Sequence, residues 1–156
     1  MGLKRRLAVG IGSVILFSIA FVVIYSITLK KEDDYNTKLI SVLKEQENVT
    51  VKDVFSFEFD RAYIFNDSYI SGEGFAERYN LDISVSEVET GASEQFQRIV
   101  FVDECGDFVY EYKCNVSDVI ILEKGIIIYP ETTIERKSSG VEKLAINFQS
   151  IDRYDS

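Results

Sequence analysis

An uncharged apolar stretch near the N-terminus, residues 7–29 (LAVGIGSVILFSIAFVVIYSITL), constrains this chain more than any other feature. A helix rises 1.5 Å per residue, so the stretch would span about 35 Å, slightly more than the hydrocarbon core of a bilayer, which is about 30 Å thick. A charge at the centre of such a helix costs about 2.5–3.5 kcal/mol on insertion, so its absence is informative. The stretch predicts a single transmembrane helix, with the lipid bilayer as its partner.

A cleaved signal peptide and a buried helix of a soluble protein are the two alternatives to a retained anchor. Basic residues before the stretch suit a signal peptide. The apolar run, however, exceeds the 7–15 residues that form the core of a signal peptide, and no small-x-small cleavage site follows it. The next residues, 30–34 (KKEDD), also make a poor cleavage site. We therefore expect the helix to be retained.

The orientation of the anchor is predicted from the basic residues on its two sides. Three of them and the terminal amine precede it, and three follow it by residue 38. Because Lys and Arg favour the cytoplasmic side, this slight excess and the six-residue head predict a cytoplasmic N-terminus. The expected organisation is a cytoplasmic head (1–6), a transmembrane helix (7–29), a juxtamembrane helix (30–50), an extracytoplasmic α+β domain (51–150) and a polar tail (151–156).

Residues 32–156 form an acidic segment that is long enough for one domain with its own hydrophobic core. They hold all 26 Asp and Glu residues and 12 of the 17 Lys and Arg residues, so their formal charge is −14. Such a surface is repelled by phosphate backbones, so no nucleic-acid partner is expected. A solvated surface and a basic protein partner are both consistent with this charge.

The chain has no His residue, which excludes several kinds of catalytic site. Ser-His-Asp and Cys-His sites need an imidazole base, and the usual catalytic zinc sites need imidazole ligands. The two Cys residues, Cys105 and Cys114, are too few to form a metal site on their own. We therefore expect no cofactor, no metal ion and no catalytic residue.

Two helices are predicted after the membrane segment. Residues 32–48 have apolar side chains at helical spacing (Tyr35, Leu39 and Val42), and the acidic residues at their start suit the first turn of a helix. A short second helix is predicted from about Gly74 to Tyr79, after a segment rich in turn-forming residues.

Alternation of aromatic and polar residues predicts a half-buried strand across Val51–Phe65. Three Phe residues share one face of this strand (Phe55, Phe57 and Phe59). Tyr63 and Phe65 are expected to continue the same face, and the Asp60-Arg61 step between them is expected to form a bulge or a bend.

The rest of the chain predicts further strands, and with them an α+β domain whose sheet is mostly antiparallel. The pattern of residues 81–95 indicates one strand and then an exposed loop. Residues 98–103 and 108–114 are expected to pair through a tight turn that contains Gly106. Later strands are expected at Val119–Leu122, at Ile126–Tyr129 and over Leu144, Ile146 and Phe148.

A disulfide between Cys105 and Cys114 is not expected from the geometry of this hairpin. Cys105 lies in the turn, and Cys114 lies nine residues along the following strand. At about 3.3 Å per residue the two are separated by roughly 30 Å, whereas a disulfide joins Cα atoms about 4.4–6.8 Å apart. Free thiols are the expected state.

Two groups of carboxylates are candidate functional sites. Asp103, Glu104 and Asp107 gather at one turn, but their spacing does not match a calcium-binding EF-hand loop, so we interpret them as a solvated acidic turn. Glu58 and Asp60 are expected on one strand face and could act as an acid–base pair. A structural ion pair of Asp60 with Arg61 is the alternative that we favour.

Residues 57–65 (FEFDRAYIF) resemble an F-x-W-D-x-x-Y-x-F motif of small uncharacterised bacterial envelope proteins, often from Firmicutes. Phe57, Asp60, Tyr63 and Phe65 match the motif, and Phe59 stands where those proteins usually have Trp. Those envelope proteins carry an N-terminal anchor or a lipoprotein signal. The resemblance implies an envelope location and a compact α+β domain, and it brings no activity.

These features lead to three functional hypotheses. The first is a non-enzymatic membrane-anchored domain that binds a protein or an envelope component. The second is an immunity-type or inhibitor protein against a cationic toxin or enzyme, since acidic inhibitors are steered to basic active sites. The third is a hydrolase that uses Glu58 and Asp60.

Overall fold

A computed structural model describes residues 35–65, 70–88, 90, 96–123, 125–137, 143–149 and 152–153. The predicted head, the predicted transmembrane helix and the first residues of the predicted juxtamembrane helix lie outside these ranges. Within them, no helix has the length and the apolar character that crossing a membrane requires.

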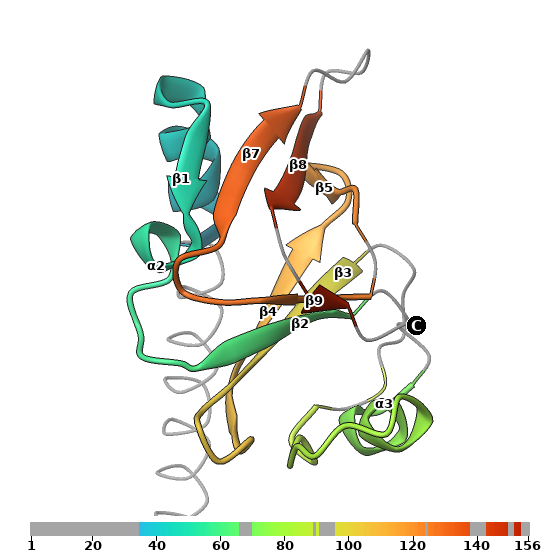
Figure 1. Ribbon diagram of the computed structural model, residues 1–156. Helices are drawn as coiled ribbons and strands as arrows, with labels where there is room; N and C mark the ends of the chain where they lie inside the picture. The colour runs from blue at the N-terminus through green and yellow to red at the C-terminus, as the bar shows by residue number, and fades with distance from the viewer. Residues whose placement is uncertain are drawn as a thin grey trace, which may run out of the picture. The chain divides into compact units, whose positions relative to one another are not determined.

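The strands of the described residues form two sheets, not the single sheet expected (Figure 1). The four-stranded sheet has the order β1 (Asn48–Thr50), β7 (Thr133–Lys137), β8 (Leu144–Gln149) and β5 (Val119–Ile121). The five-stranded sheet has the order β4 (Phe108–Asn115), β3 (Phe96–Val102), β2 (Arg61–Phe65), β6 (Ile126–Ile128) and β9 (Asp152–Arg153). Among these strands of the described residues, only β5 and β8 pair in parallel. The prediction of an α+β domain with mostly antiparallel strands is therefore confirmed.

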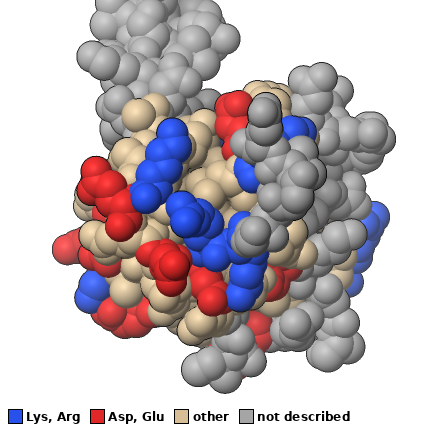
Figure 2. Space-filling model, turned by 90° about the horizontal axis from the view of Figure 1, so that it is seen from above, with Lys and Arg blue, Asp and Glu red and all other residues tan. Residues whose placement is uncertain are grey.

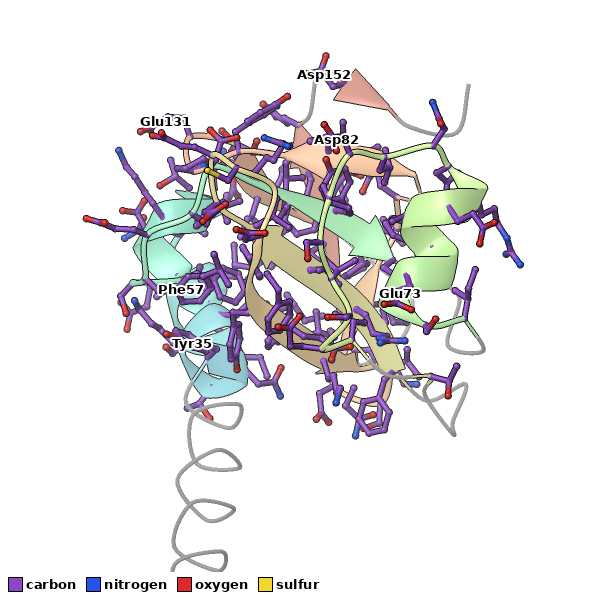
Figure 3. All side chains as sticks on the ribbon, turned by 90° about the horizontal axis from the view of Figure 1, so that it is seen from below. Tyr35, Phe57, Glu73, Asp82, Glu131 and Asp152 are labelled. Carbon is purple, nitrogen blue, oxygen red and sulfur yellow. The ribbon has the colours of Figure 1, made fainter. Side chains whose placement is uncertain are left out.

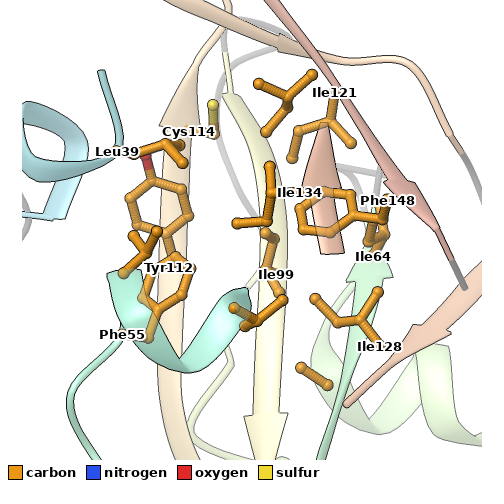
Figure 4. Close-up of a cluster of buried hydrophobic side chains, with 14 of the residues drawn as sticks. Leu39, Phe55, Ile64, Ile99, Tyr112, Cys114, Ile121, Ile128, Ile134 and Phe148 are labelled. Atoms are coloured by element: carbon orange, nitrogen blue, oxygen red, sulfur yellow. The ribbon is translucent and has the colours of Figure 1, made fainter. Parts of the chain in front are cut away.

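The central strands β2 and β3 are buried on both faces. Ala62 and Ile64 of β2 point into a large cluster that also takes side chains from the four-stranded sheet and from residues 39 and 43 (Figure 4). Tyr63 and Phe65 point the opposite way, into a second cluster formed with α3 (Gly72–Arg78) and residues 81–88. Alternate residues of β3 divide between the two clusters in the same way. Such burial removes apolar surface from water on both sides of the sheet.

The juxtamembrane helix is shorter than predicted. Residues 35–45 are helical, but residues 48–50 form strand β1, so the predicted range of 30–50 is wrong at its C-terminal end. Val49 of β1 pairs with Ile134 of β7, and this pairing takes the backbone out of the helix. The helix buries Leu39 and Leu43 completely, as the apolar spacing required.

The predicted strand Val51–Phe65 is mostly wrong. Its first four residues form helix α2 (Val51–Val54), where the backbone N–H and hydroxyl of Thr50 both donate to the Asp53 carboxylate. Residues 55–60 belong to no strand, and the strand begins only at Arg61. A bend does occur at Asp60, but it precedes the strand and does not lie within a strand ladder, as the prediction had it.

The aromatic face predicted for this segment is also divided. Phe55, Phe57 and Phe59 lie in or against the large cluster, whereas Tyr63 and Phe65 belong to the second cluster on the other side of the sheet. The alternation of Phe55 to Phe59 therefore reflects packing against the edge of a core, without a partner strand.

Other segments also differ from the prediction. Residues 81–88 form no strand and make only one isolated bridge, between Ser84 and Asp107. Strand β7 was not predicted, and the tail expected at 151–156 contains the short strand β9, which pairs with β6. Helix α3 is confirmed, although it begins two residues earlier than predicted.

The β3–β4 hairpin is confirmed, and a bulge near its turn changes which way β4 faces. Phe101 pairs with Tyr110 but Val102 pairs with Phe108, so one extra residue lies in β4. Phe108 therefore points to the second cluster, while Tyr110, Tyr112 and Cys114 face the large one. Gly106 has a φ of 84°, a conformation that glycine adopts without strain, as predicted for this turn.

Candidate functional site

Three segments emerge together at one end of the five-stranded sheet. Arg61, the first residue of β2, pairs with Val102 at the end of β3, and Ala62 pairs with Ile128 at the end of β6. Since β2 runs antiparallel to both neighbours, the residues before β2 lie beside those after β3 and β6. Residues 57–60, 103–105 and 129–130 thereby come from distant parts of the sequence to one place.

An open cleft of about 810 Å³ lies between these segments, and we call it the acidic cleft. Two half-buried aromatic rings, four carboxylates, a thiol, a phenol and a proline line it, with one lysine from α2. The lining residues are Lys52, Phe57, Glu58, Phe59, Asp60, Asp103, Glu104, Cys105, Tyr129 and Pro130. The labelled Phe57 and Glu131 lie on the same side of the domain, away from Glu73 on α3 (Figure 3).

Two of the four carboxylates are held by neighbouring groups. The Arg61 guanidinium donates to Asp60 Oδ2 at 2.6 Å and to the Tyr63 hydroxyl at 3.0 Å. The bond to Tyr63, more than the bond to Asp60, raises the pKa of Arg61. The ion pair favoured for Asp60 is therefore confirmed.

Asp103 organises the acidic turn. Its Oδ1 accepts hydrogen bonds from the backbone N–H groups of Cys105 and Asp107, both at 2.9 Å. These bonds satisfy two donors that the tight turn would otherwise leave to water. In the part of the chain that the structure describes, no three His, Cys, Asp or Glu side chains are arranged to hold a metal ion.

Glu58 and Glu104 supply the available negative charge of the acidic cleft. Both residues are exposed, and among the described residues neither carboxylate has a hydrogen-bond or ion-pair partner. Because residues 55–60 form no strand, Glu58 and Asp60 are not the strand-face pair that the sequence predicted.

The lysine of the acidic cleft is already paired. Lys52 Nζ donates to Glu131 Oε1 at 2.7 Å, and this bond raises the pKa of Lys52. Both side chains are more than half exposed, so the pair adds little stability. Its effect on the acidic cleft is to neutralise the positive charge on one wall.

Tyr129 joins the acidic cleft to the C-terminal strand β9. Its hydroxyl donates to Asp152 Oδ2 at 2.7 Å, and this bond raises the pKa of Tyr129 to about 12. The phenol is therefore neutral at ordinary pH and acts as a donor.

The two cysteines have different environments, and both thiols are free. Cys105 is exposed in the acidic cleft. Cys114 is buried, and burial raises its pKa to about 12. Cys105 lies in the turn before β4 and Cys114 lies near the far end of β4, so the two are separated along the hairpin as expected.

Sequence reasoning missed three lining residues, Lys52, Tyr129 and Pro130. Each reaches the acidic cleft through pairings between distant segments, and no local pattern marks it. The basic residue on α2 and the Tyr-Pro step after β6 had no signal of their own. No protein-family model, curated protein or solved structure matches the chain.

Replacing Asp103 tests how the wall of the acidic cleft is held. Asp103→Ala removes the acceptor of two backbone N–H groups, so we expect the free energy of unfolding to fall by about 1–2 kcal/mol. Asp103→Asn retains an acceptor oxygen and is expected to lose less than half as much. Urea unfolding of the two variants measures the difference, and equal losses would show that the turn does not depend on these bonds.

Proposed function

We propose that the chain is a single-pass membrane protein, anchored by residues 7–29 with its N-terminus in the cytoplasm, whose extracytoplasmic domain binds a basic protein or envelope component at the acidic cleft. The open acidic cleft is the observation that supports the proposal most strongly. The apolar N-terminal stretch and the resemblance of residues 57–65 to bacterial envelope proteins support the location.

The chemistry of the acidic cleft suits a cationic side chain of a partner. Phe57 and Phe59 offer half-exposed rings, and an Arg or Lys side chain gains about 0.5–1 kcal/mol over such a ring at an exposed site. Glu58 and Glu104 offer carboxylates that can receive the charged head group. Since Lys52 and Arg61 are paired with carboxylates, they oppose such a partner only weakly.

The charge on the domain is unevenly spread, so the position of the carboxylates matters. Seen from above, Lys and Arg side chains form a band between groups of Asp and Glu (Figure 2). A basic partner is therefore attracted to particular places on the surface, and the acidic cleft combines charge with a hollow.

An inhibitor role against a cationic toxin or enzyme is the second candidate, and the formal charge of −14 on residues 32–156 favours it. Complementary charge speeds association with a basic active site. A hydrolase ranks last, because Asp60 is paired with Arg61 and lies beside an exposed Glu58 without an enclosed pocket.

Removing the two available carboxylates tests the role of the acidic cleft. We expect the full chain in detergent to bind an extended arginine-containing peptide, and Glu58→Gln with Glu104→Gln to weaken this binding about tenfold, which corresponds to about 1.4 kcal/mol. Fluorescence anisotropy of a labelled peptide at low and moderate salt measures the affinity.

The matched control changes the same charge elsewhere. Glu73→Gln with Glu77→Gln alters two exposed carboxylates of α3 and is expected to change the affinity less than about twofold, the effect of screened surface charges. Equal weakening of the affinity by both double variants would mean that the peptide responds to net charge alone. That result would contradict a binding role for the acidic cleft.

The orientation is tested with the exposed thiol. We expect a membrane-impermeant maleimide to label Cys105 in intact cells that express the full chain, because Cys105 is exposed and Cys114 is buried. Cys105→Ser is expected to abolish the label. Labelling that appears only after the cells are lysed would place the domain in the cytoplasm.

A further inference from the structure

We propose that the outer edge of strand β4 pairs with the same edge of a second copy of the chain, forming an antiparallel two-fold dimer. This inference is independent of the acidic cleft. Strand β4 has eight residues and lies at the margin of the five-stranded sheet. The other edge strands, β1, β5 and β9, have only two or three residues each. A long open edge is a template for another strand.

Hydrogen bonds near the hairpin turn fix which backbone groups of β4 point outward. Asp103 N–H donates to Asp107 C=O within the hairpin, and Phe108 N–H donates outward to Ser84 C=O. Backbone N–H and C=O groups alternate in direction along β3, so those of Phe101 point toward β4, as those of Asp103 do. The backbone groups of its partner Tyr110 therefore point inward, toward β3.

The same alternation continues along the rest of β4. Tyr112 and Cys114 pair inward with Ile99 and Gln97. Glu111 and Lys113 thus direct their backbone N–H and C=O groups away from the sheet, and among the described residues these groups have no partner. Ser84 covers only the start of the edge.

The charges on this edge complement themselves in one register. If the dimer axis passes beside Tyr112, Glu111 of each copy lies opposite Lys113 of the other. Opposite charges at directly paired positions are favourable. An axis beside Glu111 would place two glutamates opposite each other, and an axis beside Lys113 would place two lysines opposite, so both shifted registers are disfavoured.

Glu111 is already positioned for this contact. The buried Arg98 side chain, only 3% exposed, donates to its carboxylate and packs over the Phe65 ring. Lys113 Nζ lies 3.6 Å from the other carboxylate oxygen of Glu111, and its side chain is 47% exposed. Pairing Glu111 with Lys113 in both directions adds about four backbone hydrogen bonds, since each such pair exchanges two.

Two variants at one position separate edge pairing from other causes of association. Lys113→Pro removes an N–H that the strand's own sheet does not use, and prolines are tolerated at such edge positions. Lys113→Glu places glutamates opposite each other in the favoured register. We expect the full chain in detergent to be a dimer by light scattering, and each variant to raise the dissociation constant at least tenfold. Circular dichroism checks that both variants fold.

Lys44→Glu is the control, because it makes the same change in net charge at an exposed helical residue. It is expected to remain a dimer. Hydrogen exchange gives a second measurement: the amides of Glu111 and Lys113 should be protected in the wild type and should exchange fast in Lys113→Glu. A monomeric wild type, or a dimer that both Lys113 variants leave intact, would overturn the proposal.

Discussion

Burial of the central pair β2–β3 on both faces is the constraint on which the rest of the structure depends. Residues such as Ile64 and Tyr63 are neighbours in sequence but belong to different hydrophobic clusters. One cluster needs the four-stranded sheet to cover it, and the other needs α3. With both faces covered, the sheet can meet solvent only at its edges and at the ends of its strands. The acidic cleft occupies one such end, and the open side of β4 is one such edge.

Local chemistry determined the parts of the fold that the sequence predicted well. The apolar run at residues 99–102 marks a strand that is buried on both faces, and Gly106 marks the turn after it. The predictions failed where long-range pairing decides the structure. Strand β7 (TIERK) has a single large apolar residue, Ile134, and is a strand because β1 and β8 flank it. Residues 55–59 alternate like a strand but find no partner, because the chain turns at Asp60.

From the sequence, the carboxylates of the candidate site were expected to form a solvated acidic turn and an ion pair of Asp60 with Arg61, and no site was predicted there. Glu58 and Asp60 are far in sequence from Asp103, Glu104 and Cys105, and the structure brings all five to one cleft. Their meeting depends on the antiparallel register of β2 with β3, which no local pattern reveals. The pairing of β2 with β6 likewise brings in Tyr129 and Pro130, which follow β6. Two of the four carboxylates, Asp60 and Asp103, are bonded to groups of the cleft wall, and the other two, Glu58 and Glu104, face solvent.

A partner seated in the acidic cleft is the central claim, and the native thiol of Cys105 offers the most direct measurement. A photo-crosslinker attached to Cys105 of the full chain in its native membranes should join the chain to a basic protein or envelope component. The same crosslinker on Lys44→Cys, in a chain that also carries Cys105→Ser, should not capture that partner. Capture from Lys44→Cys alone, or equal capture from both positions, would contradict a binding role for the acidic cleft.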